Sequence, residues 1–165
     1  MDQMIRLDIP GLDVSATARL LTERAPRTCA AIWDVLAEPV ERRLIHTATT
    51  GSSVFFYDLP ALAGARDLPI ENHTIYPKPG EILYFYQPWN GLRDLADFDP
   101  AWLRPGDNVH EVLIAYGAAN LRMPTEEGWR GSVWARIEDG LDDFAHACRQ
   151  MRIDGTKRIR LSRVV

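Results

Sequence analysis

The sequence carries no surplus of positive charge. Its 19 Lys and Arg residues are outnumbered by 23 Asp and Glu residues, which gives a net charge of −4. Domains that bind nucleic acid normally show a basic surplus or a basic run, because they must neutralise backbone phosphates. We therefore expect no nucleic-acid partner.

Long apolar runs are also missing. No stretch reaches the roughly 18 uninterrupted apolar residues that a membrane-spanning helix needs. The opening residues, MDQMIRLD, include acidic and polar side chains where a secretory signal would need an apolar run. We expect a cytoplasmic protein with no membrane partner.

Cysteine and the common catalytic motifs are scarce. Cys29 and Cys148 are the only cysteines, and both lie among apolar neighbours in helix-like segments, which is typical of buried free thiols. The spacings HxH, HxxxH and CxxC are absent, so a metal site would have to be assembled from distant segments. GxSxG, Walker and GxGxxG motifs are absent as well. We predict no metal and no cofactor.

What the chain does contain is the composition of an ordinary globular domain. It has 165 residues, of which 46% are hydrophobic and 25% are charged. That length and mixture predict a single domain over residues 1–165 with a sizeable core. Eleven glycines and eleven prolines are spread between short apolar segments, where they act as breaks between elements.

Short runs of alternating apolar and polar residues predict eight to ten strands. The first two runs flank the turn Pro10-Gly11 and form a hairpin. Residues 58–80 and 88–108 are rich in Pro and Gly and are expected to be mostly loop. The predicted strands cover residues 4–9, 14–21, 43–49, 52–57, 81–87, 109–116, 132–137 and 157–165, with a further short one at 119–123.

Two segments have helical periodicity instead. Residues 26–37 begin at Pro26, a residue suited to the first helical position, and end before Pro39. The second helix is expected to start at Asp139 as N-cap and to end at Gly155. Many short strands with two lone helices favour a mainly β fold, a closed antiparallel β-barrel of about eight strands whose open ends the helices cap.

The order of these elements, together with specific residues, resembles the cyclophilins. APRTCAAIW at residues 25–33 resembles the first cyclophilin helix, and SVWARIEDGLD at 132–142 resembles the segment entering the second. The phrases ENHTIYPKPGEILYFY at 71–86 and EVLIAYG at 111–117 are more similar still to a bacterial family of cyclophilin-like proteins of unknown function. The resemblance covers nearly the whole chain and implies a cyclophilin-type barrel.

The resemblance also implies a difference in activity. Catalytic cyclophilins carry a His-Arg pair in the strand after the first helix, and the arginine polarises the prolyl amide. The corresponding residues here are His46 and Thr47. Since isomerisation needs an electrostatic clamp on the amide, prolyl isomerase activity is the least favoured function.

The candidate catalytic residues are His46, Glu71 and His73. His46 lies on a predicted strand, where its alternative role is a hydrogen-bonded histidine in the barrel wall. Glu71, Asn72 and His73 are three adjacent polar residues in a Pro-flanked loop. Asn72 is a candidate ligand-binding residue, or it forms a turn with its own backbone.

Other candidate ligand-binding residues lie on two strands. Tyr84 and Tyr86 share one strand face with Ile82, and such tyrosines often hold a polar hydroxyl at the rim of a core. Glu111 and His110 are adjacent in a strand and so face opposite sides, with Tyr116 on the His110 face. Either face is compatible with the barrel interior, and Glu111 is the preferred ligand contact.

These residues favour a protein that binds a small molecule. The preferred hypothesis is an enzyme in which a carboxylate (Glu71 or Glu111) and a histidine (His46 or His73) perform acid–base chemistry. Its substrate would be a small polar metabolite of the amino-acid, keto-acid or ureide type. The alternative is a non-catalytic module that binds a ligand or peptide. A homodimer is compatible with the sequence.

Overall fold

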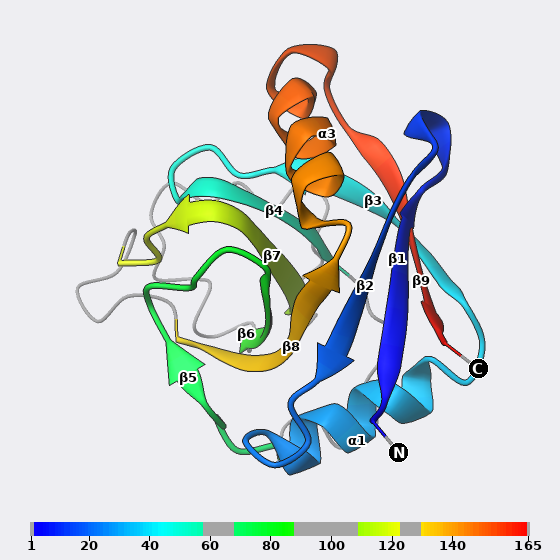
Figure 1. Ribbon diagram of the computed structural model, residues 1–165. Helices are drawn as coiled ribbons and strands as arrows, with labels where there is room; N and C mark the ends of the chain where they lie inside the picture. Colours follow the sequence, from blue (N-terminus) through cyan, green and yellow to red (C-terminus); the bar gives the residue numbers. More distant parts are fainter. Residues whose placement is uncertain (1, 58–67, 88–108, 123–129, 165) are drawn as a thin grey trace.

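The computed structural model describes residues 2–57, 68–87, 109–122 and 130–164 (Figure 1). These residues form nine strands, two α-helices and one short 3-10 helix, η1 (Pro10–Leu12). The helices are α1 (Pro26–Val35) and α3 (Leu141–Asp154). The strands are β1 (Met4–Ile9), β2 (Val14–Leu20), β3 (Val40–His46), β4 (Gly51–Tyr57), β5 (His73–Thr74), β6 (Glu81–Gln87), β7 (Val109–Ala119), β8 (Gly131–Asp139) and β9 (Lys157–Arg163).

Eight of these strands close into a barrel. Their order is β2-β1-β9-β3-β4-β7-β6-β8, and β2 pairs with β8 to complete the ring. Every pairing is antiparallel. The ninth strand, β5, lies outside the ring: Ser132 of β8 pairs with His73 on one edge and with Tyr84 of β6 on the other. The predicted closed antiparallel barrel is confirmed.

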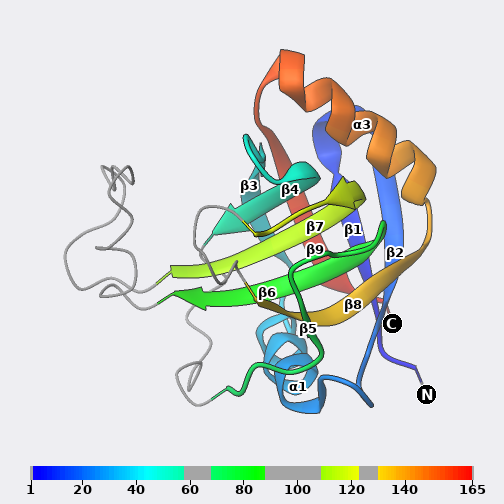
Figure 2. The ribbon, with the colours of Figure 1, turned by 90° about the vertical axis from the view of Figure 1, so that its left-hand side faces the viewer.

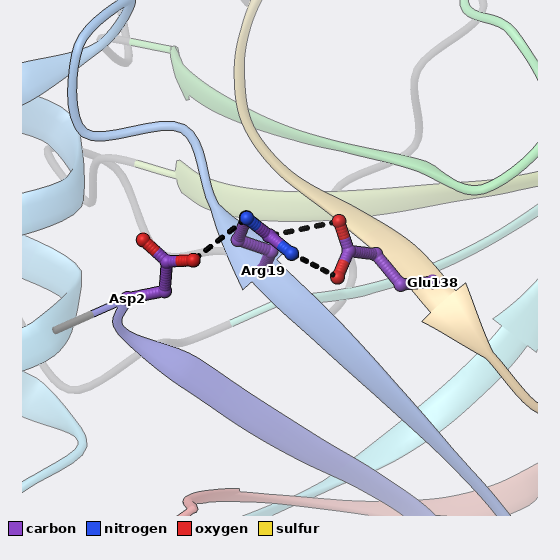
Figure 3. Close-up of polar contacts among 3 residues, drawn as sticks. All are labelled: Asp2, Arg19 and Glu138. Atoms are coloured by element: carbon purple, nitrogen blue, oxygen red, sulfur yellow. Dashed lines mark hydrogen bonds and ion pairs between the residues drawn. The ribbon is translucent and has the colours of Figure 1, made fainter.

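An exposed ion-pair group spans the seam that closes the barrel. Arg19 of β2 contacts Glu138 of β8 through two nitrogens, Nε to Oε1 at 2.8 Å and Nη2 to Oε2 at 2.9 Å. A third nitrogen of Arg19 lies 2.7 Å from Asp2 (Figure 3). Exposed pairs contribute little to stability, typically about 0–1 kcal/mol each, so closure depends mainly on the strand ladder and the core.

The barrel interior is filled by side chains at alternate strand positions, as the period of two requires. Residues from all eight barrel strands and both helices form one buried cluster. Its strand members include Ile5, Leu7, Ile9, Ala16, Ala18, Leu20, Val40, Leu44, Val54, Phe56, Ile82, Tyr84, Val112, Ile114, Tyr116, Ala135, Ile137, Ile159 and Leu161. The shared face predicted for Ile82, Tyr84 and Tyr86 of β6 is confirmed. On β7, where the sequence left either face open, it is the His110–Tyr116 face that points inward.

The two helices cover opposite ends of the barrel (Figures 1 and 2). Helix α1 turns Cys29 and Ile32 toward the core, and α3 contributes Phe144, Cys148 and Met151. The two predicted helices and their places at the ends of the barrel are therefore confirmed. Both cysteines are buried free thiols, as expected.

The structure corrects two local predictions. Asp139 is the last residue of β8, and the N-cap of α3 is Gly140, in a left-handed conformation with φ 76° and no side-chain capping bond. The polypeptide has to turn sharply from strand to helix here, and glycine is the residue that permits this conformation. The expected strand at 119–123 is also wrong as a separate element, because β7 runs on to Ala119 and Asn120 to Arg122 form no strand.

A second apolar cluster lies on the outer face of four neighbouring strands. Its buried members are Leu83, Phe85, Leu113, Ala115, Leu121 and Val133. The members on β6 and β7 alternate with the interior residues of those strands. The wall formed by β4, β7, β6 and β8 is thus apolar on both sides. In the part of the chain that the structure describes, neither helix is long and apolar enough to cross a membrane.

Candidate functional site

A groove of about 430 Å³ lies where the last turn of α3 meets the end of β3. Two segments line it: residues 45–48 from the end of β3 and the turn after it, and residues 151, 152, 155 and 156 from the end of α3 and the turn after it. Its polar side chains are His46, Thr47, Arg152 and Thr156. A volume of this order suits a small organic molecule, since ligand pockets typically measure roughly 300–1,000 Å³.

His46 is held by contacts at both ring nitrogens. Nδ1 lies 2.7 Å from the backbone oxygen of Thr47. Nε2 lies 2.7 Å from the hydroxyl of Tyr116, a buried residue of β7. The Arg152 Nε donates to the same Nε2 over 3.1 Å. The ring therefore forms part of the groove wall and is fixed against the barrel interior behind it.

These partners determine the protonation state of His46. Because the Thr47 carbonyl only accepts, Nδ1 must carry the proton; because the Arg152 guanidinium only donates, Nε2 must hold a lone pair. The imidazole is then neutral. Desolvation lowers the pKa of His46 below its usual value, the bond to the Thr47 carbonyl acts in the opposite direction, and the Arg152 charge lowers it further.

Arg152 was not predicted as a site residue. Its Nη2 donates to the backbone oxygen of Gly51 over 3.3 Å, while its Nε contacts His46. Both partners are neutral, and no carboxylate among the described residues pairs with this guanidinium. In the sequence, Arg152 is one of several exposed arginines near a helix end, and only the packing of α3 over the barrel brings it to His46.

Glu71 and Asn72 are engaged in local structure. The Glu71 carboxylate accepts hydrogen bonds from Thr28 N at 2.8 Å, Thr28 Oγ1 at 2.8 Å and Arg27 N at 3.3 Å, in the first turn of α1. Asn72 has a positive φ of 46°, and its side-chain amide donates to the Val133 carbonyl over 2.9 Å. His73, on β5, is exposed. Their predicted catalytic and binding roles remain predictions.

Tyr84, Tyr86 and His110 gather elsewhere on the inward face of β6 and β7. The Tyr84 hydroxyl lies 2.8 Å from Nδ1 of His110, and both tyrosine rings contact the imidazole ring. Desolvation raises the pKa of Tyr84, so its hydroxyl stays protonated at neutral pH. This group lies toward the opposite end of β7 from Tyr116 and His46.

Glu111 points the other way. It lies on the outer face of β7, directly between Tyr57 of β4 and Phe85 of β6, and is only 3% exposed. Burial raises the pKa of its carboxyl to about 8. The structure thus brings His46 and Tyr116 together but holds Glu71, His73 and Glu111 apart from that pair. Within the described ranges, no three His, Cys, Asp or Glu side chains are arranged to hold a metal ion.

Three solved structures share this architecture at low sequence identity. The structure of McbB in complex with tryptophan matches with a TM-score of 0.56 and 13% identity, over 96% of this chain and 44% of McbB. A cyclophilin-type peptidyl-prolyl cis-trans isomerase from Cryptosporidium parvum matches with 0.53 and 12%, over 100% and 99% of the two chains. The Mimivirus cyclophilin gives 0.52 and 11%, over 98% and 87%.

These comparisons place the protein in a class. A closed eight-stranded antiparallel barrel with a helix over each end is the cyclophilin-like fold, and identities of this size show the fold alone. This chain spans less than half the length of the McbB chain. A comparison with curated proteins finds no match. Residues 7–163 match a family described as a protein of unknown function, DUF3830, and the chain belongs to that family.

Proposed function

We propose that this protein binds a small metabolite with a carboxylate group in the groove beside His46, and that His46 exchanges a proton with it. One observation carries the proposal: a neutral imidazole and an arginine without an acidic partner among the described residues share the wall of one groove. Amino acids, keto acids and those ureides that carry a carboxylate belong to this class.

Arg152 supplies the recognition of the anion. Two of its N–H groups are used on His46 and Gly51, and the remaining ones are available to a ligand oxygen. The planar guanidinium suits a carboxylate because it can donate two parallel hydrogen bonds. Its bonds to neutral acceptors orient it without cancelling its charge.

His46 supplies the base. Two donors share the Nε2 lone pair, the Arg152 Nε and the Tyr116 hydroxyl. A ligand carboxylate that draws Arg152 toward itself removes the first donor, and a ligand proton that reaches Nε2 displaces the Tyr116 hydroxyl. The Thr47 carbonyl and the Tyr116 hydroxyl keep the ring in place and fix its tautomer. A histidine that is neutral near pH 7 is in the form that general-base catalysis requires.

The test is a ligand screen by thermal shift, followed by calorimetric titration of the hits, in a buffer without phosphate. The panel contains amino acids, keto acids, ureides and hydantoins, and it includes tryptophan because McbB was solved with it bound. Arg152→Gln should weaken binding of a carboxylate hit at least about tenfold, the loss expected when one partner of a charged pair is removed. Arg149→Gln, on the exposed side of the same helix, is the matched control.

The screen also separates binding from catalysis. If His46→Gln abolishes turnover of a bound compound but leaves its affinity within a few-fold, His46 is an acid–base residue. Binding without turnover in the wild type indicates the alternative, a non-catalytic binding module. A carboxylate hit that binds equally to Arg152→Gln and Arg149→Gln would rule out the groove as its site.

A further inference from the structure

The groove beside His46 is lined from both faces of β3. His46 points into the barrel, where its ring meets Tyr116. Ile45, one position earlier, points outward, because side chains alternate along a strand, and it pairs with Phe55 next to the outer apolar cluster. His46 and Ile45 both line the groove. The groove therefore continues from the end of the barrel over its rim to the outer wall.

Arg43 lies on this outer side. It is exposed and stands two positions before Ile45 on β3, which places both side chains on the same face. Its Nε donates to Oγ1 of Thr156 over 3.2 Å, and Thr156 lines the groove. The Arg43 guanidinium thus stands directly behind a side chain of the groove wall. Since the bond to Thr156 uses Nε alone, the two Nη groups remain for a ligand oxygen.

The charges around Arg43 favour an anion. In the ladder of β3 and β9, Arg43 is directly opposite Arg158, and like charges at such positions repel each other. Glu41 pairs with Arg158, and no carboxylate that the structure describes pairs with Arg43. The described residues that line the groove include no acidic side chain, and Asp154, the last residue of α3, is not among them. An anion beside Arg43 would relieve this repulsion.

Arg43 and Arg152 therefore stand at two sides of one groove, and each is oriented through its Nε by a neutral acceptor. We propose that the groove takes a small dicarboxylate, with one carboxylate on Arg152 and the other on Arg43, which determines specificity for the second carboxylate. This inference rests on the proposed function, which assigns the first carboxylate to Arg152. A guanidinium can donate two parallel hydrogen bonds to each carboxylate. Acidic amino acids and oxo dicarboxylates belong to this class, whereas amino acids with an apolar side chain do not.

The experiment compares dicarboxylates with monocarboxylates of the same carbon number. Each is titrated by calorimetry into the whole protein near pH 7, in a buffer without phosphate. The pairs are succinate with butyrate, glutarate with pentanoate and adipate with hexanoate, a series that also tests the span between the two arginines. We expect at least one dicarboxylate to bind about fivefold or more tightly than its matched monocarboxylate, which is the upper end for an exposed ion pair.

Arg43→Gln should remove this advantage and change the affinity for the monocarboxylate by less than about twofold, whereas Arg152→Gln should weaken binding of both series. Arg160→Gln is the matched control, because Arg160 is an exposed arginine of β9 outside the groove, and it should change neither affinity.

Two results would overturn the dicarboxylate specificity and leave the proposed function standing. The first is that both series bind equally and depend on Arg152. The second is that Arg43→Gln and Arg160→Gln bind the dicarboxylate equally. If neither series binds at millimolar concentration, the specificity is overturned as well, and the ligand screen with Arg152→Gln still tests the site of the first carboxylate by itself.

Discussion

Glu71 provides the N-terminal cap that helix α1 lacks from its own residues. Helix α1 begins after Ala25, which offers no side-chain capping bond, so the first N–H groups of the helix need another acceptor. The Glu71 carboxylate, 43 residues away along the chain from Thr28, accepts two of these backbone bonds and the Thr28 hydroxyl. Its negative charge also lies at the positive end of the helix dipole.

We predict that Glu71→Ala destabilises the protein. Removing a charged acceptor from partly buried donors should lower the free energy of unfolding by roughly 1–3 kcal/mol. His73→Ala, two residues along and exposed, should change it by less than about 0.5 kcal/mol. Urea denaturation followed by circular dichroism measures both. Equal stability of the two variants would show that the helix does not depend on Glu71 and would favour the catalytic role predicted from the sequence.

At the scale of residues, individual site residues could be predicted from the sequence, but the contacts between them could not. His46 and Tyr116 were both predicted, and the alternation of β7 placed Tyr116 on the His110 face. Their contact could not be predicted, because it depends on how β3, β4 and β7 are aligned in the closed barrel. Arg152 was missed for the same reason, since it reaches His46 only through the packing of α3 across the barrel end.

At the scale of elements, the junction of β8 and α3 is a tight turn that the sequence did not predict. Gly140 has φ 76°, and a Cβ placed on it would lie 2.5 Å from the Ser15 backbone oxygen and 3.0 Å from the Ala16 Cα. Both atoms belong to β2, which closes the barrel against β8. The absence of a side chain thus lets the start of α3 pack directly on the seam.

Gly140→Ala should therefore be costly. The positive φ and the contact with the β2 backbone together should lower the free energy of unfolding by about 2 kcal/mol or more. Gly11→Ala is the control, because a Cβ there meets nothing within 4 Å and its φ is not positive. Thermal and urea denaturation of both variants test this. A loss for Gly140→Ala no larger than that for Gly11→Ala would contradict the close approach.

The strands and helices themselves were largely predictable. Alternation identifies the barrel strands because each has one face in the apolar interior, and Pro26 and Gly155 mark helix ends by their backbone chemistry. The two-residue strand β5 was not predicted, since it exists only by pairing with β8 beyond the end of β2. The N-cap of α3 was placed one residue early because a strand running directly into a helix leaves no room for a capping side chain.

At the scale of the whole molecule, the barrel wall separates two sets of titratable residues. The inward face carries histidines paired with tyrosines at two places, His46 with Tyr116 and His110 with Tyr84. The outward face of the same strands carries Glu111 in an apolar cluster. Because a one-residue step changes the face, both sets lie on β7 without interacting. The effects of substituting Glu111 and His46 can therefore be measured independently.

Two residues on opposite sides of the barrel wall, Glu111 and His46, make the stability of the folded protein depend on pH. Glu111 titrates near 4.5 in the unfolded chain and near 8 in the folded protein. Between these values the folded state holds more protons, so its stability falls as the pH rises through this window, by up to about 1.4 kcal/mol per pH unit. The contribution of His46 to stability has the opposite sign: its pKa is lowered on folding, so its contribution is lost as the pH falls below 6.5.

We predict that Glu111→Gln removes the fall in stability toward alkaline pH. His46→Gln should remove the fall in stability toward acidic pH. Free energies of unfolding measured by urea denaturation from pH 5 to pH 9 test this, and parallel curves for the wild type and Glu111→Gln would show that this carboxyl is not desolvated.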